Sequence, residues 1–179
     1  MDIELIKNQF YWIEDTDDSY MPYRLLGIEP NASNQYEFED YEHGNTIWVN
    51  AASIKGIIPS PGEITLKSLY DDLTDAVDIS EASILWNLHK RYEAQKIYSA
   101  IGPILIAINP YCFLEEVYSD EMLAFFLNSS EVNGTRMPPH IWDIARNAYL
   151  QLKDKQVRQA IVISGESGAG GILYRGAVK

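Results

Sequence analysis

The chain has 179 residues, an apolar fraction of 46% and a formal net charge of −12. The apolar fraction is that of a folded globular protein and argues against an intrinsically disordered chain. The acidic balance argues against nucleic-acid binding, because the chain repels phosphate backbones, but not against one nucleotide held by local backbone N–H groups.

The amino terminus has none of the features of a signal peptide, since Met1 is followed by acidic Asp2 and Glu4. The longest apolar stretch, residues 101–108, is far shorter than the roughly 20 residues of a membrane helix. Cys112 is the only cysteine, which leaves neither a disulfide nor a cysteine metal cluster. We therefore expect a cytoplasmic protein with no membrane span.

Residues 10 to 58 are predicted to form short β-strands. Turn-forming residues separate four aromatic or β-branched runs, at residues 10–13, 23–26, 35–38 and 46–49. Strands of this length, with a turn every ten or so residues, predict a small barrel. The sequence Pro59-Ser60-Pro61-Gly62 then predicts a domain boundary near residues 59 to 70.

After this boundary the apolar period changes from two to 3.6 residues. Residues 80–98 are predicted to form an amphipathic helix with Ser80 as its N-cap. The apolar run Ile104 to Ile108, ended by Asn109-Pro110, predicts a strand buried on both faces.

Two further helices are predicted at residues 119–128 and 139–152, the second with Pro139 in its first turn. Residues 159–164 are another continuous apolar run and predict a second fully buried strand. This run leads directly into a glycine-rich segment.

The glycine-rich segment Gly165-Glu166-Ser167-Gly168-Ala169-Gly170 has the glycine spacing of a phosphate-binding P-loop. In that motif a lysine and a Ser or Thr follow, but here these positions hold Gly171 and Ile172. The missing lysine would make two hydrogen bonds to the phosphates, each contributing about 1.5–3 kcal/mol. Their loss weakens nucleotide binding about 10²- to 10⁴-fold. The sequence predicts a phosphate cradle without its cation or its metal ligand.

Two other interpretations of this segment stay open. It is either a tight connection after a strand or a nucleophile elbow with Ser167 at its tip. The elbow needs a histidine after the serine, whereas His43, His89 and His140 all precede it. His89 and His140 are instead predicted to be surface or capping residues.

Four motifs, in one order and spacing over roughly residues 70 to 170, resemble the motor head of myosins. They are Leu73-Thr74-Asp75 with Asn87-Leu88 and Arg91-Tyr92; Ile97-Tyr98 with Gly102 to Ile108 and Asn109-Pro110-Tyr111; Met137 to Ile141 with Ala148-Tyr149; and Gly165 to Gly170. The resemblance implies an SH3-like all-β barrel at residues 1–60. An incomplete α/β P-loop NTPase (myosin motor) domain follows at residues 61–179 and ends in a broken P-loop.

The same resemblance implies which residues hold ATP. Asn109, Pro110 and Tyr111 belong to the loop around the adenine, and Tyr118 stacks or hydrogen-bonds there. The phosphates would be bound by Gly165, Glu166, Ser167, Gly168, Ala169 and Gly170. The adenine loop departs from the family pattern, since Cys112 stands where lysine is common and Glu115-Glu116 replace a proline region.

The function implied is that of an actin-based cytoskeletal motor, an actin-activated Mg-ATPase with ATP and Mg²⁺ as cofactors and actin filaments as partner. Both switch loops and the actin-binding parts lie downstream in that family. We therefore expect a truncated, cytoskeleton-associated product that alone hydrolyses no ATP and binds no actin. The alternative is a non-motor truncated product that binds a protein partner through its SH3-like domain.

Overall fold

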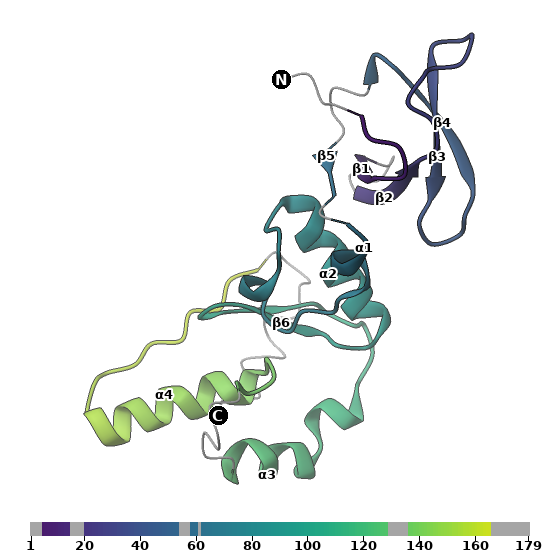
Figure 1. Cartoon of the computed structure of the whole chain (residues 1–179). Coiled ribbons are helices and arrows are strands. Elements are labelled where there is room, and N and C mark those ends of the chain that lie inside the picture. The colour runs from purple at the N-terminus through teal and green to yellow at the C-terminus, as the bar shows by residue number, and fades with distance from the viewer. Residues whose placement is uncertain (1–4, 15–19, 54–57, 61, 129–135, 166–179) are drawn as a thin grey trace. The chain divides into compact units, whose positions relative to one another are not determined.

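The structure is a computed structural model and describes residues 5–14, 20–53, 58–60, 62–128 and 136–165 (Figure 1). The chain forms two compact units, each described by itself. The first contains residues 1–69 and 75–90, and the second contains residues 70–74 and 91–179. In the described parts of the chain, no helix combines the length and the apolar character needed to cross a membrane.

The first unit contains an antiparallel sheet of five strands in the order β4-β3-β2-β1-β5. The strands are β1 (Phe10–Glu14), β2 (Tyr20–Leu25), β3 (Gln35–Asp40), β4 (Thr46–Asn50) and β5 (Ile58–Pro59). All four predicted strand runs are thus confirmed. Polar turn residues end them as expected: the side chain of Asn31 accepts hydrogen bonds from the backbone of Ser33 and Gln35.

Strand β1 is buried on both of its faces, because successive side chains point to opposite sides of a sheet. On one side Tyr11 packs with Leu25 and Phe38. On the other, Trp12 packs with the helices α1 (Glu63–Lys67) and α2 (Glu81–Glu93). These two helices therefore complete the core of the first unit.

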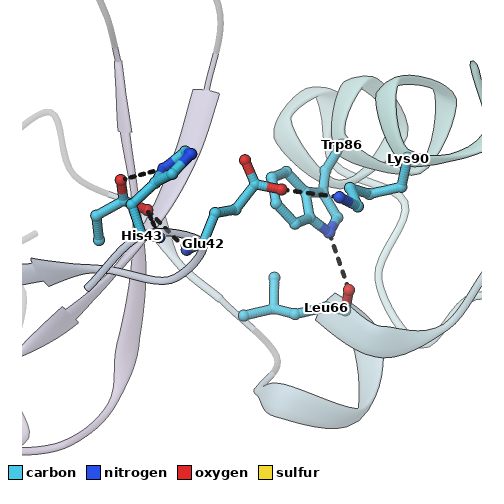
Figure 2. A network of polar contacts seen from close by, with 6 residues as sticks. Glu42, His43, Leu66, Trp86 and Lys90 are labelled. Atoms are coloured by element: carbon cyan, nitrogen blue, oxygen red, sulfur yellow. Dashed lines mark hydrogen bonds and ion pairs between the residues drawn. The ribbon is translucent and has the colours of Figure 1, made fainter. Parts of the chain in front are cut away.

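The side chain of Trp86 lies at the centre of this helix–sheet contact. Its Nε1 donates to the carbonyl of Leu66 at 3.1 Å, and its ring centroid lies 6.0 Å from those of Trp12 and Tyr41. Lys90, one turn later, pairs with Glu42 of the β3–β4 turn at 2.8 Å, as Figure 2 shows. The Trp86–Tyr41 contact and the ion pair both join α2 to the β3–β4 turn, and the Trp86–Trp12 contact joins α2 to β1.

The second unit contains the hairpin β6 (Tyr98–Ile101) and β7 (Ile104–Ala107), followed by the short 3-10 helix η3 (Glu115–Tyr118). The helices α3 (Asp120–Asn128) and α4 (Ile141–Lys155), green in Figure 1, complete it. Its core is Ile97, Tyr98 and Ile141, against which residues of β7 and η3 pack. A short 3-10 helix, η2 (Leu73–Asp75), precedes α2.

The predicted helices exist, but two of their boundaries were wrong. Helix α2 ends at Glu93 rather than Tyr98, because Gln95 has a left-handed φ of 58° and the chain then turns into β6. Helix α4 begins at Ile141 and is capped by His140, so Pro139 lies before its first turn. Ser80 caps α2 as predicted, since its Oγ accepts the Ser83 N–H at 3.3 Å.

The two predictions of fully buried strands were also wrong. Among the described residues, strand β7 pairs only with β6 and is half-buried, with Ile104 62% exposed. Residues 159–164 form no strand, and Val162 is 88% exposed. A strand buried on both faces needs a larger sheet around it, but among the described residues β7 has one partner strand and residues 159–164 have none.

Candidate functional site

The loop that follows β7 carries three of the predicted adenine-side residues. Asn109 begins it with a side-chain turn, in which its Oδ1 accepts the Tyr111 N–H at 2.9 Å. Tyr111 then adopts a left-handed φ of 53°, and its side chain is 85% exposed. Pro110, between them, has its φ fixed by its ring. The loop therefore has a defined start and presents an aromatic ring to solvent.

Tyr118, the fourth predicted residue, lies at the other end of this loop and is half-buried. Its hydroxyl is 2.8 Å from the hydroxyl of Tyr98 in β6. Its ring is stacked with that of Phe113, with centroids 6.1 Å apart, and meets Trp142 edge-on at 6.1 Å. The loop thus begins with a local turn and ends at a tyrosine held by β6 and α4, while its middle is exposed.

His140 connects the residue before Tyr118 to helix α4. Its Nδ1 accepts the N–H of Trp142 at 3.0 Å, and its Nε2 lies 3.0 Å from the carbonyl oxygen of Val117. Burial lowers the pKa of His140 below its ordinary value, although the hydrogen bond to Val117 acts in the opposite direction. Of the two predicted alternatives, surface or capping, the structure shows capping, with the side chain buried. His89 is exposed, as predicted.

A cavity of about 440 Å³ lies between β7, the start of α4 and residues 160–165. Its lining is mainly apolar and includes Tyr98, Leu105 and Ile141 together with Gly165, the first residue of the glycine-rich segment. Tyr98 therefore contacts Tyr118 through its hydroxyl and faces the same cavity as Gly165. Glu166, Ser167, Gly168, Ala169 and Gly170 lie outside the described residues.

A second cavity, of about 210 Å³, includes the charged side chains of Asp72 and Arg136 in its lining. The buried carboxylate of Asp72 accepts hydrogen bonds from the N–H and the hydroxyl of Thr74, from the N–H of Gly102 and from Arg136. Nearby, buried Arg91 donates to Ser99, to the Tyr98 carbonyl and to Asp71. These bonds hold η2 and the hairpin together. The cluster therefore has a structural role, and we do not assign it a ligand.

Sequence reasoning missed Asp72, Tyr98 and Arg136 as members of these networks. Asp72-Leu73-Thr74 did offer a signal, because an aspartate commonly accepts from the backbone two residues later. The sequence predicts Tyr98 at the end of a helix, and from that position its hydrogen bond with Tyr118 is not expected.

On the predicted adenine side, the described residues offer the exposed ring of Tyr111 and the hydroxyl of Tyr118. On the predicted phosphate side, residue 172 is isoleucine where the P-loop hydroxyl that ligates Mg²⁺ belongs.

Residues 70–173 match the family model described as myosin head (motor domain). The chain is 32% identical over 165 residues to myosin-M heavy chain of Dictyostelium discoideum, covering 92% of this chain and 9% of that protein. It is 31% identical to myosin-6 of Arabidopsis thaliana over 90% of this chain and 10% of that one. Against myosin IC heavy chain of Dictyostelium discoideum the identity is 40% over 56% of this chain and 8% of the other. The chain thus spans about a tenth of the length of these relatives.

Proposed function

The chain belongs to the myosin head family, corresponding to its amino-terminal part, and we propose that it carries the adenine side of a motor's ATP site without a working phosphate site. Family membership supports the cytoskeletal motor as the context of this function. The observation that carries the proposal is the loop from Asn109 to Tyr118, which begins with a local turn, exposes Tyr111 and ends at Tyr118, whose hydroxyl is held by Tyr98.

The proposed phosphate side consists of Gly165 to Gly170, and what supports it is sequence alone. Backbone N–H groups of such a loop surround phosphates, while lysine and the hydroxyl residue supply charge and a metal ligand. With Gly171 and Ile172 in those positions, binding through the backbone is all that remains. We propose that this chain alone therefore binds ATP weakly and does not hydrolyse it.

The experiment restores the missing groups with the double substitution Gly171→Lys and Ile172→Thr. A fluorescent ATP analogue is titrated in the presence of Mg²⁺ into the original chain and the variant. We expect binding about 10²- to 10⁴-fold tighter in the variant, from two charge-assisted contacts of about 1.5–3 kcal/mol each.

The matched control is Gly171→Met with Ile172→Val, which changes the same positions without adding charge or a hydroxyl. Equal affinities of this control and the Lys–Thr variant would refute the proposed phosphate site. ATP turnover by the original chain, proportional to protein concentration, would refute the proposed lack of hydrolysis.

Actin filaments are proposed as the partner of the complete motor and not of this chain alone. Family membership supports a cytoplasmic, cytoskeleton-associated setting for the motor. The five-stranded antiparallel sheet of the first unit agrees with an SH3-like module but is equally a feature of other small β-folds. The SH3-like assignment, the domain limits 1–60 and 61–179 and the alternative of a protein-interaction module therefore stay predictions.

A further inference from the structure

The histidine at the start of α4 has a second role besides capping that helix. We infer that His140 is a positioning residue, which holds Tyr118 in place by tying the carbonyl of Val117 to the amino terminus of α4. Its meaning for ATP rests on the function proposed above, whereas the tie itself is independent of any ligand.

The two hydrogen bonds of His140 determine its proton. Nδ1 faces the N–H of Trp142 and must present a lone pair, so the ring's hydrogen lies on Nε2 and is donated to the Val117 oxygen. Only the neutral Nε2–H tautomer makes both bonds. A charged ring would bring an Nδ1–H against the Trp142 N–H.

The choice of residue supports this second role. Ser, Thr, Asp and Asn are the usual N-caps, and each reaches only the backbone of the next residues. A histidine ring carries a second nitrogen on its far side, and here that nitrogen reaches a carbonyl 23 residues away in the chain. Capping alone does not explain this reach.

The surroundings of the ring prevent it from turning away. His140 is 5% exposed, and the centroids of Tyr98, Phe126 and Trp142 lie 4.8, 4.8 and 4.7 Å from its own. Tyr98 in turn holds the hydroxyl of Tyr118. Tyr118 is thus fixed through its backbone neighbour by His140 and through its hydroxyl by a residue packed on His140.

The test separates the tie from the cap. His140→Asn keeps a good N-cap but cannot reach Val117, whereas His140→Ala loses both bonds. A spin label on Cys112, the only cysteine and exposed within the loop, reports the motion of residues 109–118. We expect His140→Asn to increase the label's mobility while leaving α4 helicity by circular dichroism unchanged, and His140→Ala to change both.

The control is His89→Asn, which removes an exposed histidine elsewhere in the chain. An unchanged label spectrum in His140→Asn would overturn the inference. So would ¹⁵N NMR of the imidazole, assigned with the His140 variants, if it showed the Nδ1–H tautomer instead of the Nε2–H form.

A nucleotide measurement then distinguishes this inference from the proposed function. In the Gly171→Lys, Ile172→Thr background, His140→Asn should weaken ATP binding up to about tenfold, the worth of one neutral hydrogen bond. Tripolyphosphate, which has no base, should bind unchanged. An equal loss for both ligands would refute base-side positioning. No binding of ATP in the parent background would refute the proposed function and leave the label and NMR results to decide the tie.

Discussion

Asp72 gathers donors from three separate segments on one buried carboxylate. Thr74 supplies two of them, Gly102 of the hairpin turn supplies the third, and Arg136 supplies the fourth. Burial would raise the pKa of this carboxyl, but the hydrogen bonds and the charge of Arg136 outweigh it and lower the pKa below 3.8. The ionised form is therefore favoured by folding.

Asp72→Asn is expected to lower the free energy of unfolding by about 1–3 kcal/mol, because the charge and one of the two acceptor oxygens are lost while all the donors stay. Urea unfolding at pH 7 measures the difference, with exposed Asp154→Asn of α4 as control. The contribution of Asp72 is complete above its ordinary pKa of 3.8 and is lost as the pH falls below it, so the two curves should converge in acid. If Asp72→Asn is still less stable than the original chain in acid, the loss comes from altered packing and not from the missing charge.

His140 gives a second pH dependence at the residue scale. Its folded pKa is lowered, so its contribution to stability is complete above 6.5 and decreases as the pH falls below that value. Groups near the ring that also carry charge or titrate are Tyr98, Tyr118, Asp143 of α4, and Asp72 and Arg136 across the shared cavity. Of these, Asp72 has a lowered pKa and stays ionised in this range.

We expect thermal unfolding of the original chain to show a fall in stability from pH 7 to 5.5 that His140→Asn reduces. Equal slopes for the two proteins would show that His140 does not titrate in this range. Sequence reasoning predicted a surface or capping residue at His140, without choosing between the two. It missed the Val117 contact because that partner is 23 residues away and depends on how η3 packs.

Among the elements, the contact of α2 with the sheet combines an aromatic cluster and an ion pair of unequal weight. Trp86 is 2% exposed and packs on Trp12 and Tyr41. The pair of Lys90 and Glu42 is partly exposed, and such pairs contribute about 0–1 kcal/mol. Lys90 also lies over the Trp86 ring, 5.5 Å from its centroid.

Trp86→Ala is therefore expected to cost about 3–5 kcal/mol, and Lys90→Met, which keeps the apolar stem, less than about 1 kcal/mol. Guanidinium unfolding followed by circular dichroism compares the two variants. Costs of similar size would mean that the ion pair contributes as much as the aromatic cluster to holding α2 on the sheet.

The elements that sequence predicted correctly are those set by local pattern. The four main strands have aromatic or β-branched runs between turn residues, and α3 and α4 have helical periodicity. Residues 98–101 and 159–164 differ because their state depends on a partner. Tyr98 lies in β6 and pairs with Ala107 of β7 instead of ending the predicted helix. The apolar run at 159–164 has no partner strand among the described residues. Local hydrophobicity cannot supply that information.

For the whole molecule, the first unit does not end where the sheet ends. Residues 75–90 belong to it, and Ala82 and Trp86 cover the Trp12 face of β1. A piece limited to residues 1–60 would expose that face, including the fully buried Trp12 ring. Large exposed apolar patches promote aggregation. The unit should therefore need α2 to remain folded.

Limited proteolysis followed by mass spectrometry tests this expectation. Because α2 completes the core of the first unit, the smallest persistent fragment should extend past Lys90, and an isolated 1–60 polypeptide should aggregate or show no cooperative unfolding. A polypeptide of residues 1–93 is the matched comparison, since it adds α1 and all of α2. A persistent fragment ending near Pro61 that unfolds cooperatively would contradict the role given to α2. That result would instead favour an independent barrel and, with it, the protein-interaction alternative.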